Sequence, residues 1–193
     1  MAELVLFHHA QGRTPGVLAF ADELRAAGHV VHVPDLFEGR TFPDLDAGMG
    51  HVRELGFDAV IDRGRLAAEE LRPNIVYAGF SLGVLPAQQL AQTRAGAKGA
   101  LLFHAAVPTA EFGGPWPPGV PLQLHTMADD DLGDADVARE LADQIGGAEL
   151  FLYPGERHLF TDRSLPDHDE PAATLLLQRV LGFLGTVDAQ SAR

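Results

Sequence analysis

Six short apolar runs, rich in Val, Leu, Ile and Phe, recur along the chain. They lack the strict alternation of apolar and polar residues that is typical of a strand with one face in water. Each run therefore predicts a strand that is buried on both faces, as in a parallel sheet covered by helices. The predicted strands are Leu4–His8, Val30–Val33, Ile75–Ala78, Ala100–Phe103, Pro121–His125 and Glu149–Tyr153.

Between these runs, apolar residues recur with the period of a helix. In the first such segment Val17, Phe20 and Leu24 form one stripe, and Gly28 suits the position just after a helix end. The predicted helices are Gly16–Ala27, two within Asp44–Arg72, then Leu82–Ala95, Asp134–Ile145 and Pro171–Leu184. This alternation predicts a fold of the α/β class, with a mostly parallel sheet of about six strands and helices on both faces.

The length of 193 residues suits one domain with a single core. Hydrophobic residues make up 46% of the chain and charged residues 21%, which is typical of a packed globular protein and not of a disordered one. We expect residues 1–186 to form the domain and residues 187–193 to form a flexible C-terminal tail.

A net charge of -13, with Lys98 as the only lysine, narrows the range of partners. Little positive surface is left for nucleic acid or for an anionic membrane, so we expect neither as a partner. The chain has no cysteine, which excludes disulfides, thiolate metal sites and a cysteine nucleophile. Residues 1–10 lack the basic region and the apolar length of a signal peptide, so we expect a cytoplasmic protein. We expect it to be a monomer or a homodimer.

The segment Gly79–Gly83, with the sequence GFSLG, matches G-x-S-x-G. This motif forms the nucleophile elbow of α/β-hydrolases, a sharp turn between a strand and a helix that exposes a serine hydroxyl above the sheet. Here it follows the strand predicted at Ile75–Ala78 and precedes a helical segment, which is the context that the motif requires. We therefore expect a single-domain α/β-hydrolase fold with Ser81 as the nucleophile.

A serine needs a base to take its proton and an acid to orient that base. In this fold the acid and the histidine follow the nucleophile along the chain, on loops after later strands. His158 comes after the last predicted strand, so we expect it to activate Ser81. The acidic run Asp129–Asp131 follows the strand at Pro121–His125, and one of its three carboxylates is the expected acid.

Acyl transfer places negative charge on the substrate oxygen, which backbone N–H groups stabilise. In this fold one N–H belongs to the residue after the nucleophile, here Leu82, and the other to the loop after the first strand of the chain. We expect Ala10 to supply the second N–H, and a neighbour within the loop His8–Gly12 is the alternative.

The segment His104–Gly119 is too rich in proline and glycine for a helix. It follows the end of a strand, at the edge where open α/β sheets bind their ligands. Two interpretations stand side by side: Phe112 and Trp116 form the wall of a pocket, or Trp116 packs for stability alone.

Together these features resemble the dienelactone hydrolase family over nearly the whole chain. The stretches that carry the resemblance are His8–Gly12, Val33–Phe37, Gly79–Gly83 and Tyr153–Phe160. The resemblance implies a hydrolase that cleaves a small carboxylic ester or lactone through an acyl-enzyme intermediate, with no cofactor and no metal. It also places the acid five residues after His125, at Asp130, with Asp129 as the alternative.

Three positions differ from the best-known members of that family. Those members have a cysteine nucleophile where Ser81 stands, and a glutamate in the first loop where His9 stands. The arginines that hold the substrate carboxylate in those members have no secure counterpart here, since the position four residues after His158 is Asp162, with Arg163 next to it. We assign His9, Phe37 and Trp116 to the substrate pocket.

Three other classes of function compete with hydrolysis. The loop Gly12–Gly16 lies where a flavodoxin-like protein binds a nucleotide or phosphate, but it lacks the spacing of known glycine-rich phosphate loops. A metal site is the second alternative, but the chain has no H-E-x-x-H motif. Its candidate ligands are His8, His9, His104, His125, His158, Asp167 and Asp169. An inactive α/β-hydrolase would serve as a binding protein, although all three residue types of a triad are present in order.

Overall fold

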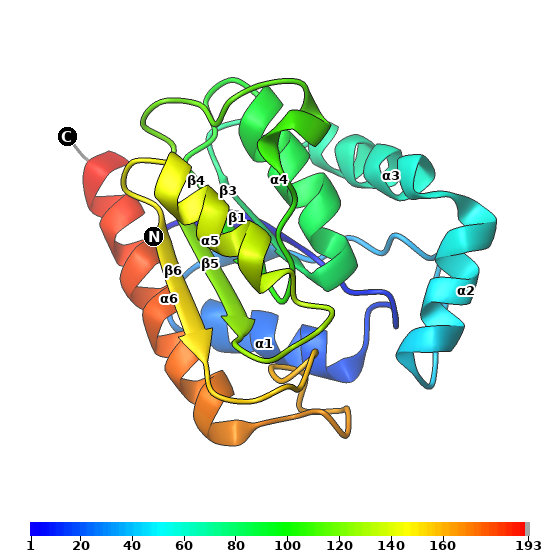
Figure 1. The fold of residues 1–193 in the computed structure, drawn as a ribbon. Helices are drawn as coiled ribbons and strands as arrows, with labels where there is room; N and C mark the ends of the chain where they lie inside the picture. Colours follow the sequence, from blue (N-terminus) through cyan, green and yellow to red (C-terminus); the bar gives the residue numbers. More distant parts are fainter. Residues whose placement is uncertain (192–193) are drawn as a thin grey trace.

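Six parallel strands form one sheet at the centre of the molecule, in the order β2-β1-β3-β4-β5-β6 (Figure 1). The computed structural model describes residues 1–191. The strands are β1 (Glu3–Phe7), β2 (Val30–His32), β3 (Val76–Phe80), β4 (Gly99–Phe103), β5 (Leu122–Met127) and β6 (Glu149–Tyr153). Each overlaps one predicted strand, so the predicted α/β class and strand number are confirmed.

The direction in which strands are added to the sheet reverses at β1. From β1 the chain crosses to β2 on one side and then returns to β3 on the other side, from which β4, β5 and β6 follow in turn. In open parallel sheets, ligands bind outside the carboxyl ends of the strands at such a reversal. The loops after β1 and β3 are therefore where a site is expected.

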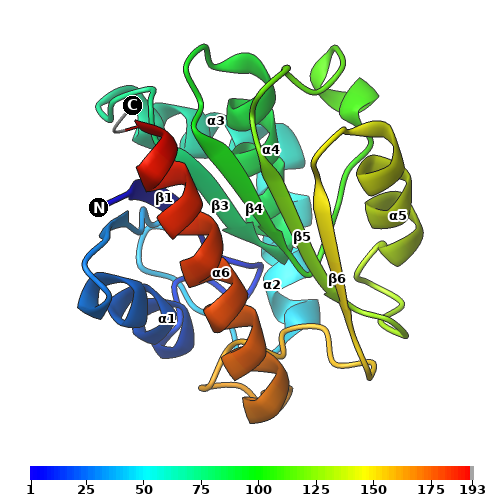
Figure 2. The same cartoon turned by 90° about the vertical axis from the view of Figure 1, so that its left-hand side faces the viewer.

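Helices cover both faces of the sheet, as predicted (Figure 2). α1 (Pro15–Ala26) and α6 (Glu170–Ser191) lie on one face, and α2 (Leu45–Leu55), α3 (Phe57–Glu69), α4 (Val84–Thr93) and α5 (Ala135–Gln144) lie on the other. β1 divides its side chains between the two faces with a period of two. Leu4 and Leu6 pack with α1 and α6, whereas Val5 and Phe7 pack with the four helices opposite.

Local sequence sets both ends of α1. The Thr14 hydroxyl accepts a hydrogen bond from the Val17 N–H at 3.3 Å, and Pro15 stands in the first turn, where a backbone N–H has no helical partner. After the helix, Gly28 has a φ of +92°, a conformation that favours glycine.

Two expectations about irregular segments are wrong. The loop predicted to contain no helix holds a short 3₁₀ helix at Thr109–Phe112 (η2), because a 3₁₀ turn needs only a few residues between a proline and a glycine. The flexible tail predicted from residue 187 is wrong for residues 187–191, which form the last turn of α6, since Val187 is buried in the core beside the sheet. Residues 192–193 of that tail lie outside the described residues.

α6 is long and apolar enough, by length and composition alone, to cross a membrane. Its apolar side chains pack inside the protein, however: Leu176, Val180 and Leu184 are fully buried in the core that α6 shares with α1 and the sheet. We therefore interpret α6 as a core helix.

A buried histidine, His125, lies within β5. Gln123 donates its amide N–H to Glu149, so its amide oxygen accepts the Nε2–H of His125 at 3.1 Å. The Nδ1 atom then accepts the hydroxyl proton of Tyr153 at 2.9 Å. Burial lowers the pKa of His125 to about 3, and the imidazole is neutral in the folded protein.

The buried His125 predicts a loss of stability that begins below pH 6.5. The pKa of His125 in the folded protein lies below the ordinary value of 6.5, so the neutral ring makes its full contribution to the free energy of unfolding above pH 6.5. As the pH falls toward 3, the unfolded chain binds a proton that the folded chain excludes, which costs about 1.4 kcal/mol per pH unit. The free energy of unfolding, measured by urea denaturation at several pH values between 7 and 5, should fall less steeply with decreasing pH in His125→Gln than in the wild type. Equal pH dependence in the two proteins would contradict this account.

The contact between α3 and α4 predicts that Gly64→Ala destabilises the protein. A Cβ at Gly64 would lie 2.3 Å from the Cβ of Pro86 and 3.3 Å from the ring of Phe7. Such crowding costs about 1–3 kcal/mol and exceeds the gain in helix propensity. The control is Gly182→Ala on α6, where the added methyl meets no atom within 4 Å and should stabilise the helix. The melting temperatures of the two variants should move in opposite directions.

Candidate active site

The turn from β3 into α4 has the geometry of a nucleophile elbow. Ser81 opens the short 3₁₀ helix η1 (Ser81–Gly83) and has a φ of +48°. A Cβ at Gly79 would lie 2.1 Å from the Gly83 carbonyl oxygen, so the sharp turn requires glycine there. A Cβ at Gly83 would lie 2.4 Å from the Phe7 carbonyl oxygen, so the second glycine lets the turn pack on the end of β1. The motif forms the turn that the sequence predicts.

A chain of hydrogen bonds runs from Ser81 through His158 to Asp130. Ser81 Oγ lies 2.7 Å from His158 Nε2, and His158 Nδ1 lies 2.8 Å from Asp130 Oδ2. A carboxylate can only accept, so Nδ1 carries the proton and donates it to Asp130. Nε2 is then free to accept the hydroxyl proton of Ser81. The structure thus brings together the three side chains that the sequence singled out.

Asp130 is the member of the acidic run that lies against His158. Its side chain is buried, whereas Asp129 and Asp131 are exposed. Gly133 leaves the space for it, because a Cβ there would lie 2.7 Å from the Asp130 carboxylate. The geometry agrees with the predicted register and not with the alternative at Asp129.

Backbone contacts hold the loop of His158 against the loop after β5. The Asp129 N–H donates to the Gly155 carbonyl at 3.0 Å, and the Arg157 N–H lies 3.2 Å from the sulfur of Met127. Gly155 has a φ of +123°, which favours glycine at this bend. The imidazole is therefore positioned by the backbone on one side and by Asp130 on the other.

The two N–H groups expected to bind an oxyanion lie in adjacent segments. Gly83 packs on the carbonyl groups of Phe7 and His8, which brings η1 against the loop that contains Ala10. Leu82 lies in the first turn of η1, where an N–H has no partner within the helix. Among residues 1–191, the Ala10 N–H also has no hydrogen-bond acceptor. Buried N–H groups without a partner are rare, so this placement suits donors that serve a ligand.

His9 and Phe37, both assigned to the substrate pocket, are buried, and their side chains contact other parts of the protein. The Nε2 atom of His9 lies 2.9 Å from Asp162, and its Nδ1 accepts the Gln11 N–H at 3.2 Å. Phe37 is 1% exposed and packs its ring against His8. Both positions follow strand ends at the ligand edge, but their side chains turn inward into the core.

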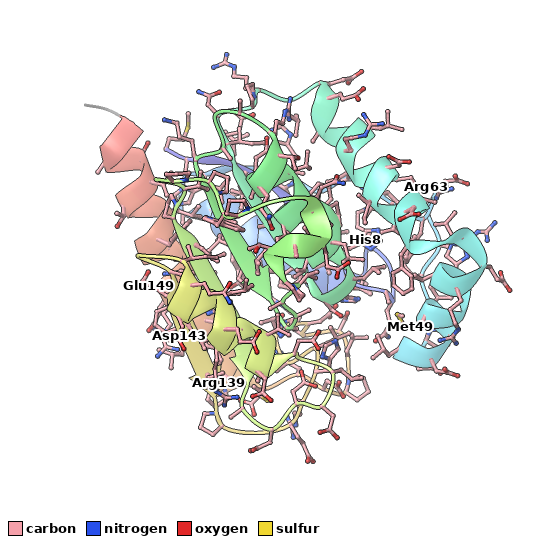
Figure 3. The ribbon with its side chains drawn as sticks, turned by 45° about the horizontal axis from the view of Figure 1, so that its top comes forward. His8, Met49, Arg63, Arg139, Asp143 and Glu149 are labelled. Carbon is pink, nitrogen blue, oxygen red and sulfur yellow. The ribbon has the colours of Figure 1, made fainter. Side chains whose placement is uncertain are left out.

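His8 links the loop after β1 to the segment after β2. Its Nδ1–H donates to the His9 carbonyl at 2.8 Å, and its Nε2 accepts the Leu36 N–H at 3.0 Å. Burial lowers the pKa of His8 to about 4, which keeps the ring neutral. Figure 3 shows His8 on the side of the sheet where α2 and α3 carry Met49 and Arg63. The Arg63 guanidinium donates to the Leu36 carbonyl at 2.7 Å and holds the same segment.

Trp116, the third residue assigned to the pocket, lies at the opposite end of the sheet, so this assignment is wrong. Its indole N–H donates to the Val120 carbonyl at 2.7 Å, just before β5 begins. Trp116, Pro121 and Gly147 line a surface cavity of about 340 Å³ beside the amino ends of β5 and β6. The long loop carries the chain away from the carboxyl ends before the tryptophan is reached.

His104 is a buried neighbour of the site that sequence reasoning considered only as a metal ligand. It follows β4 directly, with a φ of +66°, and its ring stacks on Phe80 at 5.8 Å. Its Nε2 lies 2.7 Å from the Thr161 hydroxyl, while its Nδ1 has no partner among the described residues. Burial lowers the pKa of His104 well below its ordinary value. Phe80 of β3 pairs with Phe103 of β4 in parallel register, so the next residues, Ser81 and His104, leave the sheet side by side.

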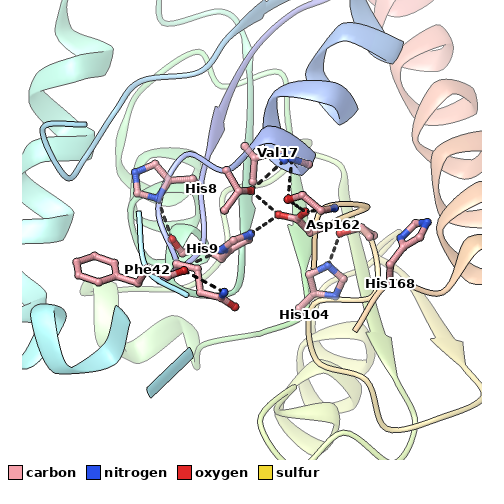
Figure 4. A network of polar contacts seen from close by, with 12 residues as sticks. His8, His9, Val17, Phe42, His104, Asp162 and His168 are labelled. Atoms are coloured by element: carbon pink, nitrogen blue, oxygen red, sulfur yellow. Dashed lines mark hydrogen bonds and ion pairs between the residues drawn. The ribbon is translucent and has the colours of Figure 1, made fainter. Parts of the chain in front are cut away.

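Asp162 is a second buried acid near the site, and the sequence analysis noted it only as a residue near the position of a family arginine. Its carboxylate accepts hydrogen bonds from His9, Thr14 and Ser164 (Figure 4). Burial alone would raise the pKa of Asp162, but these hydrogen bonds outweigh it and lower the pKa to about 2. The carboxylate is therefore charged at neutral pH.

The described residues contain no group of three or more acids and histidines arranged to hold a metal ion. Of the histidines considered for such a site, His8, His9 and His158 each have hydrogen-bond partners within the protein.

Comparisons with known proteins agree with this fold. A dienelactone hydrolase-like promiscuous phosphotriesterase from metagenomic libraries matches with a TM-score of 0.77 at 17% identity, covering 97% of this chain and 87% of its own. A dienelactone hydrolase from Anabaena variabilis matches with a TM-score of 0.67 at 19% identity, covering 94% and 84%. Mouse α/β-hydrolase domain-containing protein 10 matches with a TM-score of 0.68 at 13% identity, covering 96% and 90%.

At these identities, the structural matches establish the shared fold. A sequence search of curated proteins finds no match. The model of the dienelactone hydrolase family, by contrast, matches residues 2–188, which is nearly the whole chain. The chain is therefore a member of the dienelactone hydrolase family, with the α/β-hydrolase fold.

Proposed function

We propose that this protein is a serine hydrolase that cleaves a small carboxylic ester or lactone through an acyl-enzyme intermediate. The observation that carries the proposal is the chain of hydrogen bonds from Ser81 through His158 to Asp130, at 2.7 and 2.8 Å. Membership of a hydrolase family supports the reaction type. A serine coupled to a buried histidine and carboxylate is the arrangement that activates a hydroxyl for acyl transfer.

In the first half of the reaction, Ser81 Oγ attacks the carbonyl carbon of the ester and its proton passes to His158 Nε2. Asp130 stabilises the imidazolium that forms, and the N–H groups of Leu82 and Ala10 stabilise the oxyanion. His158 then gives the proton to the alcohol oxygen as the carbon–oxygen bond breaks. The acyl group remains on Ser81, and in a lactone the freed alcohol stays attached to that acyl group.

In the second half, a water molecule replaces the alcohol. His158 takes a proton from the water as its oxygen attacks the acyl carbon, and the same oxyanion donors act again. The bond to Ser81 Oγ breaks, His158 returns its proton to that oxygen, and a carboxylic acid leaves. Every step uses side chains and N–H groups of this chain, so we propose that no cofactor or metal takes part.

The proposed geometry would activate the serine toward more than one kind of scissile bond. One structural neighbour is described as a promiscuous phosphotriesterase. An activated serine attacks phosphorus as well as carbon, so a phosphotriester is the natural competitor. We favour the carboxylic ester because the family model that matches the chain is that of dienelactone hydrolases.

Ser81→Ala should abolish the hydrolysis of p-nitrophenyl acetate and leave the melting temperature unchanged. Loss of the nucleophile costs about 10⁴-fold or more in kcat in enzymes of this mechanism. A fluorophosphonate should label the wild type at Ser81 and should not label the variant. EDTA should leave the wild-type rate unchanged.

Two outcomes would overturn the proposed mechanism: activity in a folded Ser81→Ala protein, or loss of wild-type activity in EDTA that zinc restores. A wild-type protein that hydrolyses phosphotriesters but no carboxylic esters would overturn the proposed substrate class.

Asp130→Asn should lower kcat by about 10⁴-fold, because the amide no longer holds the imidazole in the tautomer that accepts the serine proton. Asp129→Asn and Asp131→Asn are matched controls, since both side chains are exposed on the same run. Their kcat values should stay within about tenfold of the wild type. If Asp129→Asn is the inactive variant, the acid is misassigned; if all three are active, the proposed triad fails.

A further inference from the structure

The carboxylate of Asp162 is buried outside the proposed triad and has hydrogen bonds to both oxygens. Oδ2 accepts the Nε2–H of His9 at 2.9 Å and the hydroxyl of Thr14. Oδ1 accepts the N–H of Ser164 at 2.8 Å and its hydroxyl at 2.6 Å. A charged group that is 3% exposed needs such partners, because a buried charge without hydrogen bonds costs several kcal/mol.

These contacts join three segments that are far apart in the sequence. His9 belongs to the loop after β1, Thr14 caps the first turn of α1, and Asp162 belongs to the loop after β6 that also carries His158. The approach is close, because a Cβ at Gly16 would lie 1.6 Å from Asp162 Oδ1. Figure 4 shows Asp162 between His9 and the start of α1.

The link to the loop after β1 is directional. His9 donates from Nε2 to Asp162, so its Nδ1 has no proton and accepts the Gln11 N–H. The imidazole is thereby tied to the carboxylate at one end and to the backbone at the other. Ala10 lies between the two tied residues, and its N–H is the unpartnered donor next to η1. An oxyanion donor must be held within a few tenths of an ångström of its productive position to act in the transition state.

The other side of the same link is equally fixed. Thr161, next to Asp162, pairs its hydroxyl with His104 at 2.7 Å, and His104 stacks on Phe80, the residue before Ser81. The loop of His158 is thus attached to the end of β4 and to the loop after β1 at consecutive positions.

We propose that Asp162 is a positioning residue of the active site: through His9 it fixes the Ala10 N–H relative to Ser81 and His158. Asp162 contacts neither the proposed nucleophile nor the base, and it acts on the reaction only through the backbone of the loop after β1. The inference rests on the proposed function, because it needs an oxyanion for the Ala10 N–H to stabilise.

Asp162→Asn tests the inference by separating kcat from KM. The neutral amide is a weaker acceptor than the carboxylate, and its N–H must face a donor, either of Ser164 or of His9, so the anchor of the loop after β1 is weakened. Since an oxyanion donor acts only in the transition state, kcat for p-nitrophenyl acetate should fall about 10- to 100-fold while KM changes less than about threefold. The limb of the pH profile of kcat/KM that reports His158 should stay in place, because the contact with Asp130 is intact.

Ser164→Ala is the matched control. It removes the hydrogen bond from the Ser164 hydroxyl to the same carboxylate, and the bond that this hydroxyl accepts from the Gly16 N–H, but leaves the pair with His9. It should lower the melting temperature, as Asp162→Asn does, and keep kcat within about threefold of the wild type. If Asp162→Asn does not fold, His9→Phe takes its place, because it removes the link while keeping a ring in the space; the same fall in kcat is expected.

The outcomes that overturn the inference differ from those that overturn the proposed function. Wild-type kcat in folded Asp162→Asn or His9→Phe would overturn it. The inference would also be overturned if kcat fell in proportion to the melting temperature in both Asp162→Asn and Ser164→Ala, because that pattern would mean a structural role alone. Failure of the proposed function would instead appear in the wild type, as absence of hydrolysis and of labelling at Ser81.

Discussion

The register of the parallel sheet is the constraint on which the rest of the site depends. Phe7 of β1 lies beside Gly79 of β3, and Phe80 of β3 lies beside Phe103 of β4. The residues that follow these strands therefore leave the sheet at the same level and the same edge. The elbow, the loop after β1 and His104 meet there because their strands end together. Two glycines at the elbow then allow backbone to touch backbone, which brings the unpartnered N–H groups near the serine.

Buried histidines allow polar loops to pack at this edge without losing hydrogen bonds. Five of the nine histidines are buried. A neutral imidazole has one donor and one acceptor, so it can join two segments in a fixed direction. His8 does so between the His9 carbonyl and the Leu36 N–H, and His125 does so within the outer strands. Because burial lowers the pKa of both rings, these links keep their direction at neutral pH.

The sequence predicted the parts of the molecule that depend on local pattern. Buried strands, helical stripes and the elbow each carry a short-range signal. The fixed order of residues in the fold placed His158 and the acidic run, and the family resemblance selected Asp130 within that run. Contacts across many residues had no such signal, so the link from His9 to Asp162 was missed. Trp116 was misplaced because composition shows that a loop is irregular but not how far it travels along the sheet. The end of α6 was missed because burial of Val187 depends on the neighbouring sheet.

The close approach of Gly16 to Asp162 has a consequence for how this sequence can diverge. The space that a side chain at position 16 would need is already filled by the carboxylate. A relative that acquires alanine or a larger residue there must therefore lose or redirect the acid at position 162, and with it the partner of His9. The residues at positions 9, 16 and 162 are therefore coupled, and across relatives of this chain they should be substituted together or not at all.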